Sequence, residues 1–157
     1  KLYYPDDTIQ HAGVVIGMLG IAGHVYNGCF REDTGIFGRL KVRQNVSAVT
    51  AAVLMIKKSV YLEVEGLDEE MFKVAFNDID LCMKVISAGY EIIWTPYSEL
   101  YHYESKSRGS ENTPEKYKRF QNEIRNFDKK WGMWLKDPFY NENLDLLKTY
   151  PVVKQED

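Results

Sequence analysis

Hydrophobic side chains recur at helical spacing in the segment that follows residue 77. Four of them share one face of such a helix: Leu81, Cys82, Val85 and Ile86. Asn77 precedes the segment as a suitable N-cap, and Gly89 follows it as a helix terminator. The pattern therefore predicts a helix from Asp78 to Ala88 that carries acidic residues in its first turn.

A second helical pattern covers residues 115–130. Its apolar positions are three or four residues apart: Tyr117, Phe120, Ile124 and Phe127. Just before it, residues 105–114 are mostly Ser, Lys, Arg, Gly, Glu and Asn, which predicts a flexible loop. We expect the aromatic residues beyond the helix to hold the tail onto the body, so that 115–143 forms a helix and aromatic tail within one domain of 1–157.

Extended structure is predicted between and before the helices. Residues 46–56 are rich in Val, Ala and Thr, which favours a strand buried on both faces. Residues 90–95 form a second strand pattern that Pro96 ends. Residues 17–38 contain six glycines and no clear period, which predicts a long loop. Strands mixed with helices predict an α/β fold.

Composition and charge narrow the class of protein. The 157 residues are 45% hydrophobic and 27% charged, as in globular proteins, and the net charge of -3 argues against a nonspecific nucleic-acid binder. Cys29 and Cys82 lack metal-site spacing and predict buried free thiols in a reducing compartment. The chain starts at Lys1 rather than Met, so we expect a fragment whose beginning is missing.

Two residues 24 positions apart are candidates for one cleft. A helix of 11 residues rises about 16 Å, and a strand returning from residue 90 covers that distance before His102. Asp78, at the helix N-terminus, could accept a proton from a hydroxyl. His102 could bind a divalent ion, while Lys106 or Arg108 could contact diphosphate oxygens. Each also has a plain structural interpretation, since acids often cap helices and a lone His is often structural.

Several segments form an ordered series: LYYPDDTIQHAGV (2–14), VTAAVLMI (49–56), GLDEE (66–70), FNDIDLCMK (76–84), TPY (95–97), LYHYES (100–105) and SRG (107–109). In this order and spacing they resemble the second half of family 2 glycosyltransferases, particularly bacterial enzymes that build cell-surface polysaccharides. The resemblance implies a partial GT-A fold, an α/β fold whose mixed β-sheet is packed by helices, without the N-terminal nucleotide-binding half.

The resemblance also implies the chemistry. The expected reaction is inverting, non-processive transfer of a sugar from a nucleotide-sugar donor to a glycan or lipid-linked acceptor. It requires a divalent metal, Mg or Mn, bound mainly through an Asp-x-Asp motif upstream of this chain, so the fragment should be inactive alone. We expect a cytoplasmic protein, at the inner face of the membrane through peripheral association, and a homodimer formed through the vacated sheet edge.

Residue by residue, the resemblance implies that Asp78 is the catalytic base. Asn77 replaces the usual acidic partner, and Asp80, Thr50 and Ala51 match positions on the acceptor side. The letters of Asp78 to Asp80 spell Asp-x-Asp, but they occupy the base helix rather than the metal-binding position.

The implied diphosphate side consists of His102 near the metal and Lys106 and Arg108. Two other classes of function remain open from the residues alone. One is a noncatalytic module that binds glycans or a partner chain through its 3 Trp and 11 Tyr. The other is a hydrolytic metal site built from Asp78, Asp80 and His102, which lacks further His or Cys ligands at suitable spacing.

Overall fold

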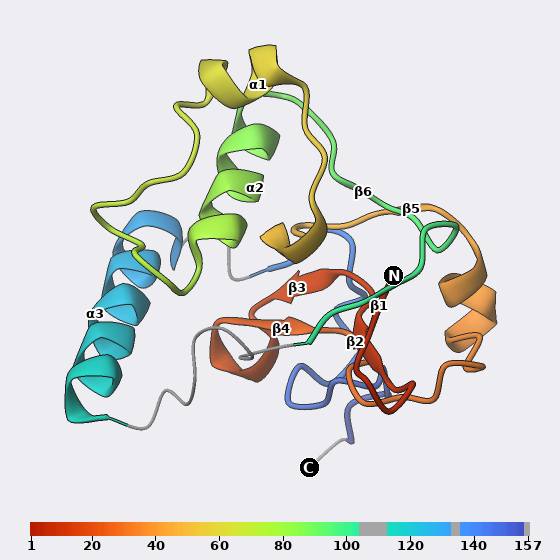
Figure 1. The fold of residues 1–157 in the computed structure, drawn as a ribbon. Helices are drawn as coiled ribbons and strands as arrows, with labels where there is room; N and C mark the ends of the chain where they lie inside the picture. Colours follow the sequence, from red (N-terminus) through yellow and green to blue (C-terminus); the bar gives the residue numbers. More distant parts are fainter. Residues whose placement is uncertain (104–112, 133–135, 156–157) are drawn as a thin grey trace.

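The computed structural model describes residues 1–103, 113–132 and 136–155. Its elements, with 3-10 helices labelled η, are β1 (Leu2–Tyr3), β2 (Ile9–His11), β3 (Val14–Ile16), η1 (Met18–Gly20), β4 (Ala22–His24), η2 (Ile36–Lys41), β5 (Gln44–Asn45), η3 (Ala51–Val53), α1 (Lys58–Glu63), α2 (Asn77–Ser87), β6 (Ile93–Trp94), β7 (Leu100–Tyr101) and α3 (Pro114–Trp131). Small mixed sheets packed by helices confirm the α/β class (Figure 1).

The strands form three small sheets. In the largest, β1 lies between an antiparallel β2 and a parallel β7. The other two are the antiparallel pairs β3–β4 and β5–β6. The pairing of β1 with β7 joins the two ends of the first hundred residues, since the His102 backbone N–H donates to the Tyr3 carbonyl at 3.0 Å. His102 is thereby fixed beside the first strand.

Both predicted helices are present, with small differences at their ends. The C-terminal helix runs from Pro114 to Trp131, and Thr113 caps it by accepting a hydrogen bond from the Lys116 N–H at 3.3 Å. Helix α2 ends before Gly89, which has a φ of +88°. The prediction of Asn77 as N-cap is wrong by one residue, because Phe76 takes that position and Asn77 is the first helical residue.

The predicted strand over residues 46–56 is wrong. Val46 and Ala48 are buried and make single contacts, one to the Ile92 carbonyl and one as a bridge to Val14. After Thr50 the backbone turns into the short helix η3, whose residues are exposed. An apolar composition favours burial, but a strand also needs a partner along its length, and this segment has one only at its start.

The predicted long loop over residues 17–38 is also interrupted. Strand β4 lies inside it and pairs with β3 along three residues, with Val14 opposite His24. Gly23, in the middle of β4, lies so close to Met18 that an added Cβ would be 2.7 Å from the Met18 Cγ atom. Glycine is therefore required here for close packing rather than for a loop conformation.

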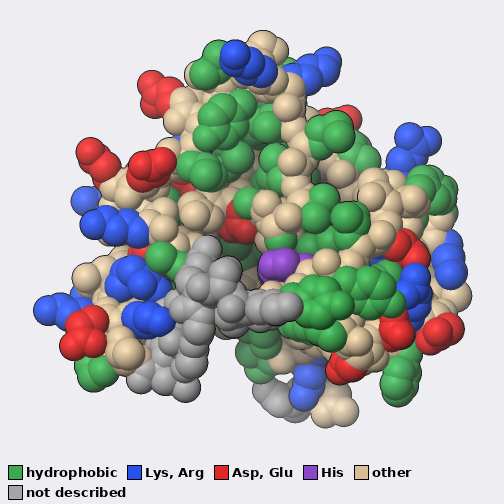
Figure 2. All heavy atoms as spheres, viewed as in Figure 1, with side chains coloured by type: hydrophobic (Ala, Val, Ile, Leu, Met, Phe, Trp, Pro, Cys, Tyr) green, Lys and Arg blue, Asp and Glu red, His purple; other side chains and the backbone are tan. Residues whose placement is uncertain are grey.

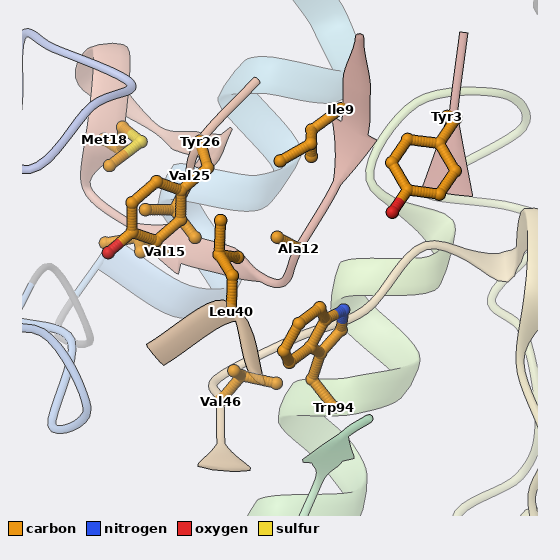
Figure 3. Packing of buried hydrophobic residues seen from close by; sticks show 10 residues of the cluster. All are labelled: Tyr3, Ile9, Ala12, Val15, Met18, Val25, Tyr26, Leu40, Val46 and Trp94. Atoms are coloured by element: carbon orange, nitrogen blue, oxygen red, sulfur yellow. The ribbon is translucent and has the colours of Figure 1, made fainter. Parts of the chain in front are cut away.

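The buried apolar side chains of the described residues form three clusters, one of which joins α1 to α2, while the other two take alternate residues of β3. One of these two contains the residues drawn in Figure 3: Tyr3, Ile9, Ala12, Val15, Met18, Val25, Tyr26, Leu40, Val46 and Trp94. The other joins Val14 and Ile16 to α2 and α3. Both cysteines are free, but only Cys82 is buried as predicted, since Cys29 is half-buried. Burial raises the pKa of the Cys82 thiol to about 11. Figure 1 shows α2 and α3 on one side and β1 and β2 on the other.

Candidate functional site

The N-terminus of α2 brings together several residues that the sequence analysis selected. The half-buried Asp78 carboxylate accepts hydrogen bonds from the Ala51 N–H at 3.1 Å and from the Ile79 N–H at 2.9 Å. Thr50 caps the same turn, accepting from the Ala52 N–H at 3.3 Å. Asn77 accepts from the backbone N–H of Asp78 at 2.7 Å. Backbone N–H groups of η3 and α2 thus hold the Asp78 side chain at the start of the helix.

Asp80, one of the predicted acceptor-side residues, is fully buried. Its Oδ1 atom accepts from the indole N–H of Trp131 at 2.8 Å and lies 2.8 Å from Nζ of Lys130. Nζ of Lys84 lies 3.6 Å from its other oxygen. Burial lowers the pKa of Lys130, but hydrogen bonds to Asp80 and Asp68 outweigh this and raise it on balance. In this arrangement Asp80 joins α2 to α3.

His102 is held in one orientation by Gln10. Its Nδ1 lies 2.8 Å from the Gln10 side-chain oxygen, while the Gln10 amide group donates to the His102 carbonyl at 3.3 Å. The second bond fixes which end of the amide faces the ring, so Nδ1 carries the proton. In the neutral imidazole Nε2 then keeps its lone pair and can bind a cation or accept a proton.

A pair of histidines that the sequence analysis did not select includes His11, which follows Gln10 in β2. The Nδ1 atoms of His11 and His24 are 3.0 Å apart, and the rings meet edge to face. Burial and the nearby His24 hold the pKa of His11 well below its usual value. The Nε2 atom of His11 is buried without a hydrogen-bond partner. No sequence spacing indicated this pair, because it depends on the pairing of separate strands.

Asp78 and His102 make no hydrogen bond or ion pair with each other, but neighbouring strands connect them. Gln10 binds His102, and the adjacent His11 contacts His24 of β4. Across the sheet Val14 lies opposite His24 and bridges to Ala48, three residues before Ala51. Figure 2 shows a hollow near the middle of one face in which histidine and acidic side chains are both visible.

A cavity of about 620 Å³ lies along α2, but neither Asp78 nor His102 is on its wall. Its lining includes Val49, Cys82, Val85, Trp94 and His11.

Lys106 and Arg108, together with residues 105–112 of the predicted loop, lie outside the described residues, as does Trp134 of the aromatic tail. The structure therefore describes Asp78 and the turn that contacts it, whereas the predicted diphosphate contacts lie outside the described residues.

The described residues contain no group of three or more His, Cys, Asp or Glu side chains that could hold a metal ion. His102 could supply one ligand through Nε2, so a divalent ion at this position would need ligands from outside the described residues. None of the described helices is long and apolar enough to cross a membrane.

Two known proteins are similar to nearly the whole chain. It is 56% identical over 150 residues to the uncharacterized protein y4gI of Sinorhizobium fredii, covering 93% of this chain and 16% of that protein. It is 32% identical over 158 residues to the O-antigen biosynthesis protein RfbC of Myxococcus xanthus, covering 95% of this chain and 12% of that protein. The chain thus spans less than a fifth of either relative. No family model and no solved structure matches it.

Proposed function

We propose that this chain is the acceptor-side half of an inverting family 2 glycosyltransferase domain with a GT-A fold, acting in cell-surface polysaccharide synthesis. The observation that carries the proposal is the placement of two aspartates, Asp78 and Asp80, within the first turn of α2. Asp80 is buried against Lys130 and Trp131, while Asp78 is half-buried at the start of α2. The name of the Myxococcus relative, an O-antigen biosynthesis protein, supports the same area of metabolism.

In this proposal Asp78 is the general base. Each of its oxygens accepts one backbone hydrogen bond and keeps a further lone pair for a substrate hydroxyl. The acceptor hydroxyl transfers its proton to the carboxylate while its oxygen forms a bond to the anomeric carbon of the donor. The bond from that carbon to the diphosphate breaks, and the diphosphate leaves with the electron pair. General-base assistance of this kind contributes about 10²–10⁴-fold to a rate.

The other predicted residues have supporting roles. Thr50 and Ala51 form the turn that fixes Asp78 and gives an acceptor access to the backbone, while Asn77 and Asp80 hold the start of the helix. His102 fits a metal-binding role, because its Nδ1–H is bound to Gln10 and its Nε2 is the ligand atom. A bound Mg or Mn ion would neutralise charge that develops on the diphosphate.

Lys106 and Arg108 are proposed to contact the same diphosphate. The complete enzyme is proposed to work as a non-processive transferase on the cytoplasmic side of the membrane, with peripheral association and a homodimer as further expectations. The nucleotide-binding half and the main metal ligands would come from outside this chain.

An assay of the complete protein that contains this chain tests the proposal. It is incubated with labelled UDP-, GDP- and dTDP-sugars, extracted bacterial glycolipids and either Mn²⁺ or EDTA. We expect metal-dependent transfer of label and release of nucleoside diphosphate from at least one donor. Asp128→Asn, which replaces an exposed carboxylate on α3, should transfer at the wild-type rate. Failure of every donor with every acceptor fraction contradicts the proposal.

A noncatalytic glycan-binding module is the second candidate. It is favoured by exposed aromatic rings on either side of β7 in the sequence, where Tyr97 and Tyr103 are 73% and 56% exposed. Such rings can stack on sugars. The same assay separates the candidates, because retention of glycans on immobilised protein without any transfer would favour the module, and transfer would exclude it.

A further inference from the structure

A buried carboxylate on α3 holds the loop that leads into α2. Glu123 is 3% exposed, and its Oε1 accepts hydrogen bonds from the backbone N–H groups of Lys73 and Val74 at 3.0 and 3.1 Å. Its Oε2 accepts from the Ala75 N–H at 2.8 Å. Three consecutive backbone donors therefore meet one charged group, and hydrogen bonds to a charge are stronger than neutral ones. Arg119 adds an ion pair at 3.8 Å.

The next residue has a strained backbone that α3 also holds. Phe76 has a φ of +64°, a backbone conformation that residues other than glycine rarely adopt. Its ring stacks on Phe120 with centroids 5.7 Å apart and packs against Phe127 at 5.3 Å. Such strain persists only where the surroundings enforce it, and it is often found at functional sites. The positive φ sets the direction in which α2 begins.

Asp78 thus lies between two attachments to the same helix. On one side are the contacts of Glu123 to residues 73–75, and on the other is the buried contact of Asp80 with Lys130 and Trp131. Helix α3 therefore determines where the first turn of α2 lies relative to η3. The hydrogen bond of 3.1 Å between Asp78 and the Ala51 N–H depends on that placement.

We propose that Glu123 is a positioning residue for the base, holding Asp78 in line with the acceptor hydroxyl through the loop of residues 73–76. This inference rests on the proposed transferase function. A glutamine at this position has one acceptor oxygen where the carboxylate has two, and its NH₂ group would face a backbone N–H. At least one of the three loop contacts would be lost, and the start of α2 could shift.

Kinetics of the complete protein test this role. A shift of the base affects the transition state more than donor binding, and a misplacement of about 1 Å can cost about 10²-fold. Glu123→Gln should therefore lower kcat by about 10- to 100-fold with little change in the donor KM. Glu123→Asp keeps the charge and should recover part of the rate. Glu115→Gln, an exposed change of the same type on α3, should behave as the wild type.

Amide hydrogen exchange gives a readout that does not depend on activity. In Glu123→Gln the amides of residues 73–75 should exchange faster while those of α3 stay protected. A wild-type kcat in Glu123→Gln, or equal losses in Glu123→Gln and Glu115→Gln, would overturn the inference. A rise in KM alone would also overturn it. If the wild-type protein transfers no sugar, the proposed function fails, and the positioning role fails with it whatever the exchange data show.

Discussion

The helix pair α2–α3 and the strand region of residues 1–57 are held together by different contacts. In the helix pair, the buried carboxylates of Asp80 and Glu123 are hydrogen-bonded across the interface, each to residues about 50 positions away. In the strand region, backbone pairing and a cluster of apolar side chains dominate, together with a polar contact between the buried His11 and the half-buried His24. The proposed base lies where charged groups fix the geometry.

This difference indicates what each region contributes. Apolar packing tolerates small shifts, because contacts of this kind have no direction. Hydrogen bonds to a buried carboxylate depend on direction and distance. Removing one partner of such a buried pair lowers the stability of the fold, because the other partner stays buried without it. The helix pair therefore holds Asp78 in one position, while the strand region supplies the body against which it is held.

The largest expected effect on stability is in the helix pair. Asp80→Ala would leave the ammonium group of Lys130 and the indole N–H of Trp131 without their buried partner. Breaking a buried pair costs about 3–5 kcal/mol, which urea unfolding of the chain would measure. Asp128→Ala, on the exposed side of α3, should change the free energy of unfolding by less than about 0.5 kcal/mol. Equal losses would remove the distinction between the regions.

In the strand region we expect the free energy of unfolding to fall most when a buried apolar side chain is shortened. Leu40 is 1% exposed within the cluster that contains Tyr26 and Val46. Leu40→Ala should lower the free energy of unfolding by about 2–5 kcal/mol through the cavity it creates. Val42→Ala, at an exposed position two residues on, serves as the matched control in the same denaturation experiment. A loss from Leu40→Ala no greater than the control would show that this cluster does not hold the region together.

Acid should weaken the strand region through His11. Its pKa in the folded chain is held well below the usual 6.5 by burial and by His24, so the unfolded chain binds the proton first as pH falls. The stability that neutral His11 contributes is therefore fully present above pH 6.5. Below that value the free energy of unfolding falls by up to about 1.4 kcal/mol per pH unit. Urea unfolding between pH 7.5 and 5.5 measures this slope. A slope unchanged by His11→Gln would contradict it.

The smallest effect concerns the two thiols. Burial raises the pKa of Cys82 in α2 to about 11, and it also raises the pKa of the half-buried Cys29 in the strand region. Iodoacetamide at pH 8 should therefore label Cys29 first, while Cys82 should react only as fast as the helix pair opens. Mass spectrometry of the peptides gives both rates. Equal labelling in the native chain would indicate that α2 is not firmly packed.

The helices could be predicted from sequence because their signals are local. Helix α3 has a regular apolar stripe and the cap Thr113, and α2 has Gly89 after its last turn. The strand predicted over residues 46–56 failed because its pairing depends on distant segments, which a local pattern does not contain. The same holds for β4, which lies in the glycine-rich residues 17–38 and forms only by pairing with β3.

The candidate site divides in the same way. Asp78, Ala51 and His102 could be selected because the chain resembles a known family at those positions. Their supporting contacts could not be predicted, since the hydrogen bond of Trp131 to Asp80 depends on the packing of two helices. One signal was available: Glu123 lies on the apolar stripe of α3, three residues after Phe120 and four before Phe127. An acid in such a position indicates a buried polar contact.

The central claim is that Asp78 takes the proton of the acceptor hydroxyl, and single-turnover transfer by Asp78→Asn in the complete protein tests it most directly. Asparagine keeps the shape of the side chain but has no basic carboxylate. With donor already bound, the account predicts that the rate of transfer falls by about 10²–10⁴-fold, while donor affinity, measured by calorimetry, stays at its wild-type value. Transfer by Asp78→Asn at the rate of the wild type would contradict the account.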